Sequence, residues 1–241
     1  MERFRGLFWS GLFSFMMGCC VGSHGNGAQP VASRHPETSL DGKAAAERIM
    51  RMTVAILAES DNVKITSCAG VWVEKNLILT AAHCVDEEKK FYKYATIDDI
   101  DSDDTRYAIV LRADEGDDLA LLFVDPDSVP EHPIAVLTPE AIAAGDSVDI
   151  VGHTAGYPWT FSRGCVSAVR ENIRTASGSY VKKIAQISAP VWMGNSGGGA
   201  FDKNGYLVGL SSWISKSGPD LAFFIHKDVI EAFLIREFSK M

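Results

Sequence analysis

Short apolar runs separated by turn residues dominate the chain from about Ala44 onward. Many of these runs contain valine, isoleucine or threonine, residues that favour β-strands. Their spacing is typical of an all-β barrel or sandwich and does not suit repeated β-α-β units. The runs that predict strands cover residues 53–57, 69–73, 77–80, 108–111, 119–123, 147–151, 181–187 and 206–210.

Only residues 227–238 show convincing helical spacing, because apolar side chains recur there at intervals of three and four. We therefore predict an all-β domain followed by one C-terminal helix. The predicted apolar face of this helix contains Val229, Ile230, Phe233, Leu234 and Phe238.

The first residues have the pattern of an export signal. Arg3 and Arg5 precede the apolar run 7–17, which is too short to span a bilayer. A small residue stands before Cys19, and this junction resembles a bacterial lipobox, which implies a lipid on Cys19 and attachment to a membrane. The alternative is ordinary cleavage before about Gln29. In both cases we expect the mature protein to leave the cytoplasm.

The composition divides the chain into three segments. Residues 1–21 are assigned to the signal, and residues 22–43, rich in Gly, Ser and Pro, predict a flexible tether. Residues 44–241 form the predicted folded domain. We expect a periplasmic or envelope-anchored lipoprotein, or alternatively an extracellular protein.

The charge balance argues against nucleic acid or anionic lipid as an electrostatic partner. The formal net charge is -8, whereas such partners require a clustered positive surface. The acidic run 98–104 lacks the glycine-centred loop of a calcium site, so we interpret it as a solvated loop. The histidines show no zinc spacing, and His153 is interpreted as a loop residue. We expect neither a metal nor a cofactor.

The segment 194–199, Gly-Asn-Ser-Gly-Gly-Gly, is suited to expose a nucleophile. Acyl transfer by serine needs a free hydroxyl, a base that takes its proton, and donors for the developing oxyanion. The glycines allow a tight turn that uncovers Ser196, and the backbone N–H groups of Gly194 and Ser196 can serve as the oxyanion donors. Taken alone, the segment is also compatible with a simple flexible turn.

Two other segments supply the remaining groups. His83 follows a strand-like run and a small-residue turn, and Asp118 stands at the head of an apolar run, where it can lie against an imidazole. Either residue alone is commonly structural. Their appearance in the order His, Asp, Ser is much more specific.

Together, residues 80–84, 118–122 and 194–198 resemble the three signature blocks of trypsin-like serine peptidases. The order His, Asp, Ser is that of chymotrypsin. The resemblance covers roughly residues 48–238. It implies a chymotrypsin-like fold of two antiparallel six-stranded β-barrels with the catalytic residues between them.

The same resemblance implies a role for each residue. Ser196 is the nucleophile, His83 is the base that later protonates the leaving amine, and Asp118 fixes the histidine tautomer. Asp117 competes with Asp118 for the third role. We prefer Asp118 because it occupies the family position, and because the side chain at 117 points to the opposite face of an extended segment.

The resemblance also implies a disulfide between Cys68 and Cys84, which lie sixteen positions apart. This bond ties the histidine loop to the preceding strand, contributes about 3 kcal/mol in the chain-entropy model and requires an oxidising compartment. Cys165 then has no partner in the domain, and we interpret it as a small buried hydrophobe.

Asn195 separates the chain from the zymogen branch of this family. Digestive and clotting relatives carry an acidic residue at this position, which pairs with a newly cut N-terminus. Here the residue is neutral, and no matching start lies near residue 48. The chain is more similar to the bacterial branch, such as the protease domain of HtrA-like enzymes. Those enzymes carry PDZ modules after the protease domain, and we expect none here.

The primary specificity pocket is also assigned by resemblance. Pro190, or its neighbour Ala189, corresponds to the floor, and Ser212, Trp213 and Ala222 correspond to the walls. None of these side chains is acidic, so nothing would pair with a substrate lysine or arginine. We therefore expect no cleavage after basic residues; Asp220 is the one acid that could reach the pocket, and we interpret it as a turn residue. Phe223 and Phe224 would narrow the site, which favours small or medium apolar residues.

These features predict a serine endopeptidase that hydrolyses protein or peptide substrates at or outside the cell envelope. The alternative from another class is a catalytically silent binding protein on the same scaffold. An esterase with a different fold is disfavoured, because its histidine would come last in the chain, whereas His83 precedes Ser196.

Overall fold

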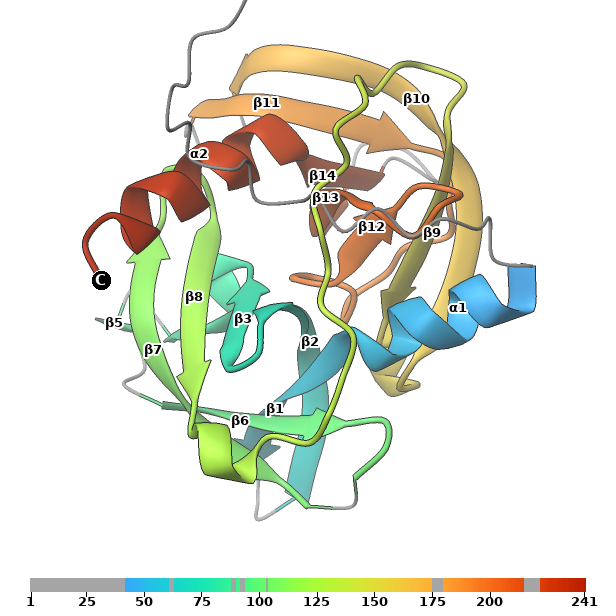
Figure 1. Cartoon of the computed structure of the whole chain (residues 1–241). Helices are drawn as coiled ribbons and strands as arrows, with labels where there is room; N and C mark the ends of the chain where they lie inside the picture. Colours follow the sequence, from blue (N-terminus) through green and yellow to red (C-terminus); the bar gives the residue numbers. More distant parts are fainter. Residues whose placement is uncertain are drawn as a thin grey trace, which may run out of the picture. The chain divides into compact units, whose positions relative to one another are not determined.

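The computed structural model describes residues 42–60, 63–87, 90–91, 94–102, 104–174, 180–214 and 222–241 (Figure 1). The predicted signal with Cys19 lies outside the described residues, as does the predicted tether up to residue 41. None of the helices in the described ranges is both long and apolar enough to cross a membrane.

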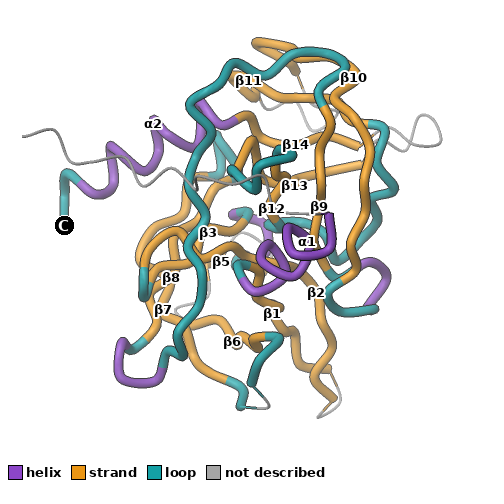
Figure 2. Tube along the Cα trace, turned by 45° about the vertical axis from the view of Figure 1, so that its right-hand side comes forward, coloured by secondary structure: helices purple, strands orange, loops and turns teal. Residues whose placement is uncertain are grey.

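Two closed antiparallel β-barrels, each of six strands, make up the described domain (Figure 1). In Figure 2 the strands of both barrels are orange. The strand order is β1-β2-β3-β8-β7-β6 in the first barrel and β10-β11-β14-β13-β12-β9 in the second. This confirms the predicted fold class. The first barrel contains β1 (Thr53–Ser60), β2 (Val63–Glu74), β3 (Leu77–Thr80), β6 (Tyr94–Asp99), β7 (Arg106–Asp114) and β8 (Leu119–Val124); the second contains β9 (Ser147–Gly152), β10 (Thr160–Arg174), β11 (Tyr180–Ile187), β12 (Gly199–Phe201), β13 (Leu207–Ile214) and β14 (Ala222–His226).

The remaining elements are short or lie outside the barrels. A small sheet pairs β4 with β5, and three single-turn helices lie in the loops. Two α-helices flank the barrel sequence. The bounds are β4 (Asp86–Glu87), β5 (Lys90–Phe91), η1 (Ala82–Cys84), η2 (Pro126–Ser128), η3 (Thr154–Gly156), α1 (Gly42–Arg51) and α2 (Lys227–Phe238).

The apolar runs predict the strands well but miss one helix. Each of the eight predicted runs falls in or overlaps a strand, and the predicted C-terminal helix has the bounds of α2. Helix α1 was not predicted, because it is short and largely polar and buries only Ala45 and Ile49. It begins at Gly42, so the ordered domain starts two residues before the predicted boundary.

Strands β3 and β8 are apolar at nearly every position because they contribute to two cores. Leu79 of β3 and Leu121 of β8 belong to a core shared with residues of the second barrel, such as Phe201. The alternate residues Ile78 and Leu122 belong to the core inside the first barrel, since successive side chains of a strand point to opposite faces. Each fully buried leucine contributes about 1.5–3 kcal/mol. The two strands that carry His83 and Asp118 at their ends are thus held from both sides.

Helix α2 follows the second barrel but is fastened to the first. Arg236 Nη2 lies 2.6 Å from Asp114 Oδ2 at the end of β7. Arg112 Nε of β7 lies 3.2 Å from an oxygen of Glu237, whose side chain is buried. These ion pairs connect the end of the chain to the turn that precedes Asp118.

The acidic run 98–104 is only partly the solvated loop that we predicted. Asp99 is buried at the end of β6, where Oδ1 accepts a hydrogen bond from Trp72 Nε1 at 3.1 Å and Oδ2 accepts one from Arg106. Burial raises the pKa of Asp99, although Trp72 and Arg106 act against this shift. Asp99 is a structural residue of the first barrel, whereas Asp101 is exposed.

We expect the domain to lose stability between about pH 6.5 and pH 4, partly through His226. This residue is buried, and its Nδ1 accepts a hydrogen bond from the backbone N–H of Asp228 at the start of α2. Burial lowers the pKa of His226 to about 4, whereas an unfolded histidine titrates near 6.5. The unfolded state therefore binds the proton first, and acidification across this range costs up to roughly 3 kcal/mol through this one group.

The His226→Asn variant tests this expectation, because asparagine still caps a helix but does not titrate. In urea unfolding, the variant should lose less stability than the wild type between pH 7 and pH 4.5. Equal losses in the two proteins would contradict the account.

Candidate active site

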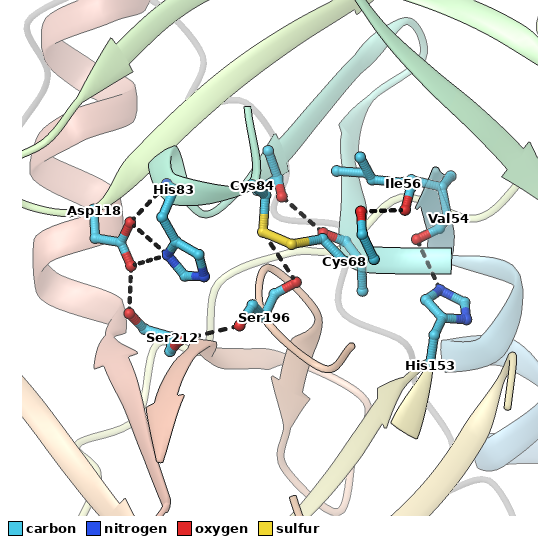
Figure 3. The surroundings of a disulfide bond; sticks show 12 residues. Val54, Ile56, Cys68, His83, Cys84, Asp118, His153, Ser196 and Ser212 are labelled. Carbon is cyan, nitrogen blue, oxygen red and sulfur yellow. Dashed lines mark hydrogen bonds and ion pairs between the residues drawn. A yellow bond between two sulfur atoms is a disulfide. The ribbon is translucent and has the colours of Figure 1, made fainter. Parts of the chain in front are cut away.

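His83 and Asp118 meet because β3 and β8 are paired. His83 lies in η1 directly after β3, and Asp118 immediately precedes β8. The Nδ1 atom of His83 is 2.9 Å from each carboxylate oxygen of Asp118, and the backbone N–H of His83 donates to Oδ1 at 3.1 Å (Figure 3). A carboxylate accepts, so Nδ1 carries the hydrogen and Nε2 is left free as an acceptor.

The environment of His83 favours its protonated form. Burial acts to lower the pKa of His83, but the hydrogen bond and the charge of Asp118 outweigh it, so the pKa lies above 6.5. A base with such a partner is stabilised once it has taken up a proton. The arrangement therefore suits a group that accepts a proton and later returns it.

Asp118 is held from both barrels. Its backbone has φ 53°, a left-handed conformation that aspartate tolerates better than most residues, and its carbonyl accepts from Ala82 N–H at 3.1 Å. The hydroxyl of Ser212, from β13 of the second barrel, donates to Asp118 Oδ2. Figure 3 shows this carboxylate between His83 and Ser212.

The hydroxyl of Ser196 is hydrogen-bonded to a residue that also binds Asp118. Ser196 Oγ donates to the carbonyl oxygen of Ser212 at 3.1 Å (Figure 3). Within the described part of the chain, no hydrogen bond joins Ser196 Oγ to His83 Nε2. Contacts between nucleophile and base are often loose without substrate. The Ser196 hydroxyl must exchange its hydrogen bond to Ser212 before it can give a proton to His83.

The backbone of Ser196 is fixed against the first barrel. Its carbonyl accepts from Ala69 N–H at 2.7 Å, and it lies 3.5 Å from the sulfur of Cys84. Cys84 forms a disulfide with Cys68, with a Cα–Cα distance of 5.9 Å. Gly197 has φ 80°, and a Cβ there would lie 2.2 Å from Ala69 O, so only glycine fits this approach.

Two backbone N–H groups in the turn before β12 are available for an oxyanion. The Met193 carbonyl accepts from Ala155 N–H at 2.8 Å, and the Asn195 carbonyl accepts from Gly198 N–H at 2.9 Å. The N–H of a trans peptide points opposite to its C=O, so the N–H groups of Gly194 and Ser196 point away from these partners. Neither N–H has a hydrogen-bond acceptor among the described residues.

Asn195 is buried with a neutral partner. Its Oδ1 accepts from Thr154 Oγ1 at 3.1 Å, and a Cβ on Gly152 would lie 2.2 Å from the same oxygen. The position that carries an acid in zymogen relatives is therefore filled by a polar contact inside the second barrel.

Asp117 points away from His83. Its carboxylate is buried and lies 2.7 Å from Nζ of Lys182 on β11. The two neighbouring aspartates thus have different partners, and only Asp118 contacts the imidazole. The Lys182 pair also connects the turn before β8 to the second barrel.

The predicted pocket residues are not all placed as expected. Pro190 is exposed, whereas Ala189 and Ala222 are buried in the core of the second barrel. Ser212 contacts both Asp118 and Ser196. The sequence around Ser212 does not predict these contacts. The side chain of Trp213 lies outside the described part of the structure.

Two cavities of the described structure lie elsewhere. One, of about 880 Å³, is lined by α1 and residues 129–134, and the other, of about 440 Å³, by residues 138–148 and 202–208. Neither is lined by His83, Asp118 or Ser196.

The cysteines give no metal site in the described ranges. Ligand atoms of Cys68, His83 and Cys84 lie within 4.8 Å of one another, but both sulfurs are in the disulfide and are not thiolate ligands. The prediction that Cys165 is a buried hydrophobe is wrong. It is partly exposed, and its sulfur lies 3.2 Å from the hydroxyl of Ser188.

Two six-stranded barrels with histidine, aspartate and serine brought together from both define the chymotrypsin-like class of fold. Sequence comparison agrees with this class. The profile of the trypsin-like peptidase domain family matches residues 68–210, more than half of the chain. The chain belongs to this family.

Its relatives include HtrA-type and Deg-type proteases. Protease Do-like 5, chloroplastic, from Arabidopsis thaliana is 26% identical over 165 residues, which cover 65% of this chain and 51% of that protein. A probable periplasmic serine protease do/HhoA-like from Haemophilus influenzae is 32% identical over 155 residues, which cover 63% of this chain and 32% of that protein. The chain thus spans about half or less of the length of these relatives.

Solved structures of serine proteases share the fold. The HtrA-type protease AlgW with a decapeptide has a TM-score of 0.67 and 21% identity, over 80% of this chain and 66% of that chain. The serine endoprotease from Yersinia pestis has a TM-score of 0.64 and 20% identity, over 80% of this chain and 64% of that chain.

We expect the two neighbouring aspartates to act differently on the pKa of His83. The Asp118→Asn variant removes the charge that opposes burial and leaves only a neutral acceptor for the hydrogen bond, so the pKa of His83 should fall below its wild-type value. Asp117→Asn, the matched control, should leave it unchanged, because Asp117 pairs with Lys182. An NMR titration of the His83 ring protons measures both. A fall in the Asp117→Asn variant alone would contradict the assignment.

Proposed function

We propose that the chain is a serine endopeptidase that hydrolyses peptide bonds through an acyl-enzyme on Ser196. The observation that carries this proposal is the juxtaposition of three features: the His83–Asp118 pair, the neighbouring Ser196 hydroxyl, and the two unbonded N–H groups of Gly194 and Ser196. A base, a nucleophile and an oxyanion site are the parts that acyl transfer requires.

The first half of the proposed reaction is formation of the acyl-enzyme. Ser196 Oγ leaves the Ser212 carbonyl, gives its proton to His83 Nε2 and attacks the substrate carbonyl carbon. The oxygen that becomes negative accepts hydrogen bonds from the N–H groups of Gly194 and Ser196. Asp118 stabilises the protonated His83, which then donates its proton to the leaving amine as the C–N bond breaks.

Hydrolysis of the acyl-enzyme completes the cycle. A water molecule gives a proton to His83 as its oxygen attacks the ester carbon, and His83 returns this proton to Ser196 Oγ as the C–O bond breaks. The raised pKa of His83 supports both steps, since the same group must hold a proton between them.

The proposed substrates are exported or envelope proteins and peptides. The predicted signal, with the tether and the lipid on Cys19, would place the domain in the periplasm or on the envelope, and two relatives, from Haemophilus influenzae and Escherichia coli, are named as periplasmic proteases. An oxidising compartment also suits the Cys68–Cys84 disulfide. Cleavage after lysine or arginine is not part of the proposal, because Ala189, Pro190 and Ala222 are uncharged.

One observation favours the alternative of a catalytically silent binding protein on this scaffold. The Ser196 hydroxyl is hydrogen-bonded to the carbonyl of Ser212 and not to His83. In a silent protein, this contact would persist when a peptide binds. In the proposed enzyme, it is exchanged for a contact with His83.

The Ser196→Ala variant should lose peptide hydrolysis, with a fall in kcat on the order of 10⁶-fold, the loss seen when the nucleophile of subtilisin is removed. The control is Ser188→Ala, which removes an exposed hydroxyl next to Cys165 and should keep the wild-type rate. Both variants should retain the wild-type Tm. Unchanged turnover in purified Ser196→Ala protein would refute the proposal.

The cleavage sites in a peptide library should contain small or medium apolar residues, and not lysine or arginine, before the cut bond. The physical reason is that no carboxylate is present among the predicted pocket positions to pair with a buried cation. Mass spectrometry of the products, with Ser196→Ala protein as the blank, gives the profile. Dominant cleavage after basic residues would show that the pocket is assigned wrongly.

A further inference from the structure

His153 is buried beneath the turn that precedes Ser196. Its ring is fully enclosed, with Nε2 3.1 Å from the carbonyl oxygen of Val54 on β1 and Nδ1 3.1 Å from the backbone N–H of Trp159. A carbonyl only accepts and an amide N–H only donates. The ring is therefore neutral, with its hydrogen on Nε2. Figure 3 shows His153 directed at Val54.

The backbone that starts at His153 holds the oxyanion turn. His153 N–H donates to the carbonyl of Gly194 at 3.2 Å, and Ala155 N–H donates to the carbonyl of Met193 at 2.8 Å. A Cβ on Gly194 would lie 2.1 Å from His153 O. Without the Ala155 contact, the peptide between Met193 and Gly194 is free to rotate, which would replace the Gly194 N–H donor by a carbonyl oxygen.

This supporting segment has a strained backbone. Ala155 has φ 52° and ψ 31°, and Trp159 has φ 49°. Left-handed conformations cost roughly 1–2 kcal/mol for each such residue, so they persist only where other contacts impose them. Two hydrogen bonds of the His153 ring hold this segment. Nε2 donates to the Val54 carbonyl of β1 at one end, and Nδ1 accepts from the N–H of Trp159 at the other. The Trp159 ring also packs edge-on against the imidazole.

We infer that His153 is a positioning residue, which in its neutral Nε2–H tautomer keeps the Gly194 N–H directed toward the substrate oxyanion. This inference rests on the proposed peptidase function. It assigns to a buried histidine on β9–η3 the support that an ion pair with a new N-terminus gives in zymogen relatives. His153 does not touch substrate; it acts through Ala155 and Met193.

The chemistry of the ring agrees with this role. A proton on Nδ1 would face the N–H of Trp159, so the charged form breaks the support. Burial lowers the pKa of His153 to about 4, although the hydrogen bond with the Val54 carbonyl acts to raise it. The groups that contact the ring, namely the Val54 carbonyl and the N–H and indole of Trp159, carry no charge. The support therefore persists at all pH values well above 4.

The test compares His153→Phe, which fills the site but makes neither hydrogen bond, with His153→Gln, which keeps a donor for Val54. The matched control is His132→Phe. His132 also stacks on a tryptophan and contacts a backbone carbonyl, but it lies on another element and is far from Ser196 in the sequence. His153→Phe should lower kcat about 10²-fold, the loss typical of one oxyanion donor, with KM nearly unchanged. Affinity for a peptide boronate should fall by a similar factor. His153→Gln should recover part of the loss, and His132→Phe should show none.

A second readout does not require activity. The ¹⁵N–¹H resonance of Gly194 should shift strongly in His153→Phe and not in His132→Phe, while the pKa of His83 stays at its wild-type value in both. Unchanged kcat and an unchanged Gly194 resonance in folded His153→Phe protein would overturn the inference. An inactive wild type would instead refute the proposed function, and the Gly194 resonance would still decide the role of His153.

Discussion

The antiparallel pairing of β3 with β8 places the two residues of the acid–base pair side by side. Thr80 pairs with Ala120, so the chain that leaves β3 toward His83 passes the chain that enters β8 from Asp118. Leu79 and Leu121 bury this pair of strands against the second barrel. The distance of 2.9 Å between Nδ1 and the carboxylate is thus a result of core packing, which protects the geometry from local motion.

The second barrel and helix α2 hold the turn of residues 114–118, which carries Asp118. Arg236 pairs with Asp114, Lys182 pairs with Asp117, and the Ser212 hydroxyl donates to Asp118 itself. These three contacts fall within residues 114–118. They connect the turn that orients the Asp118 carboxylate to the second barrel and to α2. Separation of the barrels would therefore disturb the pair before it unfolds either barrel. The proposed nucleophile is held by the reverse contact, in which Ser196 O accepts from Ala69 N–H of the first barrel.

Most of the fold could be predicted from the sequence, because barrel strands leave apolar runs bounded by turns. No predicted run fell in β6, β10, β12 or β14, of which β12 has only three residues, and α1 was missed because it is short and largely polar. The blocks around His83 and Asp118 predicted that these two residues lie together, whereas the Ser196 hydroxyl bonds the Ser212 carbonyl and not His83. The contacts of Ser212 and His153 could not be predicted, since each joins residues far apart in the chain. The burial of Asp99 inside an acidic run depends in the same way on Trp72 and Arg106.

In the proposed peptidase the surroundings of Ser196 activate its hydroxyl, and covalent trapping detects this activation. The wild-type domain is treated with a fluorophosphonate, whose phosphorus reacts with an activated serine, and the adduct is located by peptide mass spectrometry. The account predicts a single adduct on Ser196 that is absent in His83→Ala protein and in unfolded wild type. No adduct on folded protein, or equal labelling of other serines, would contradict it.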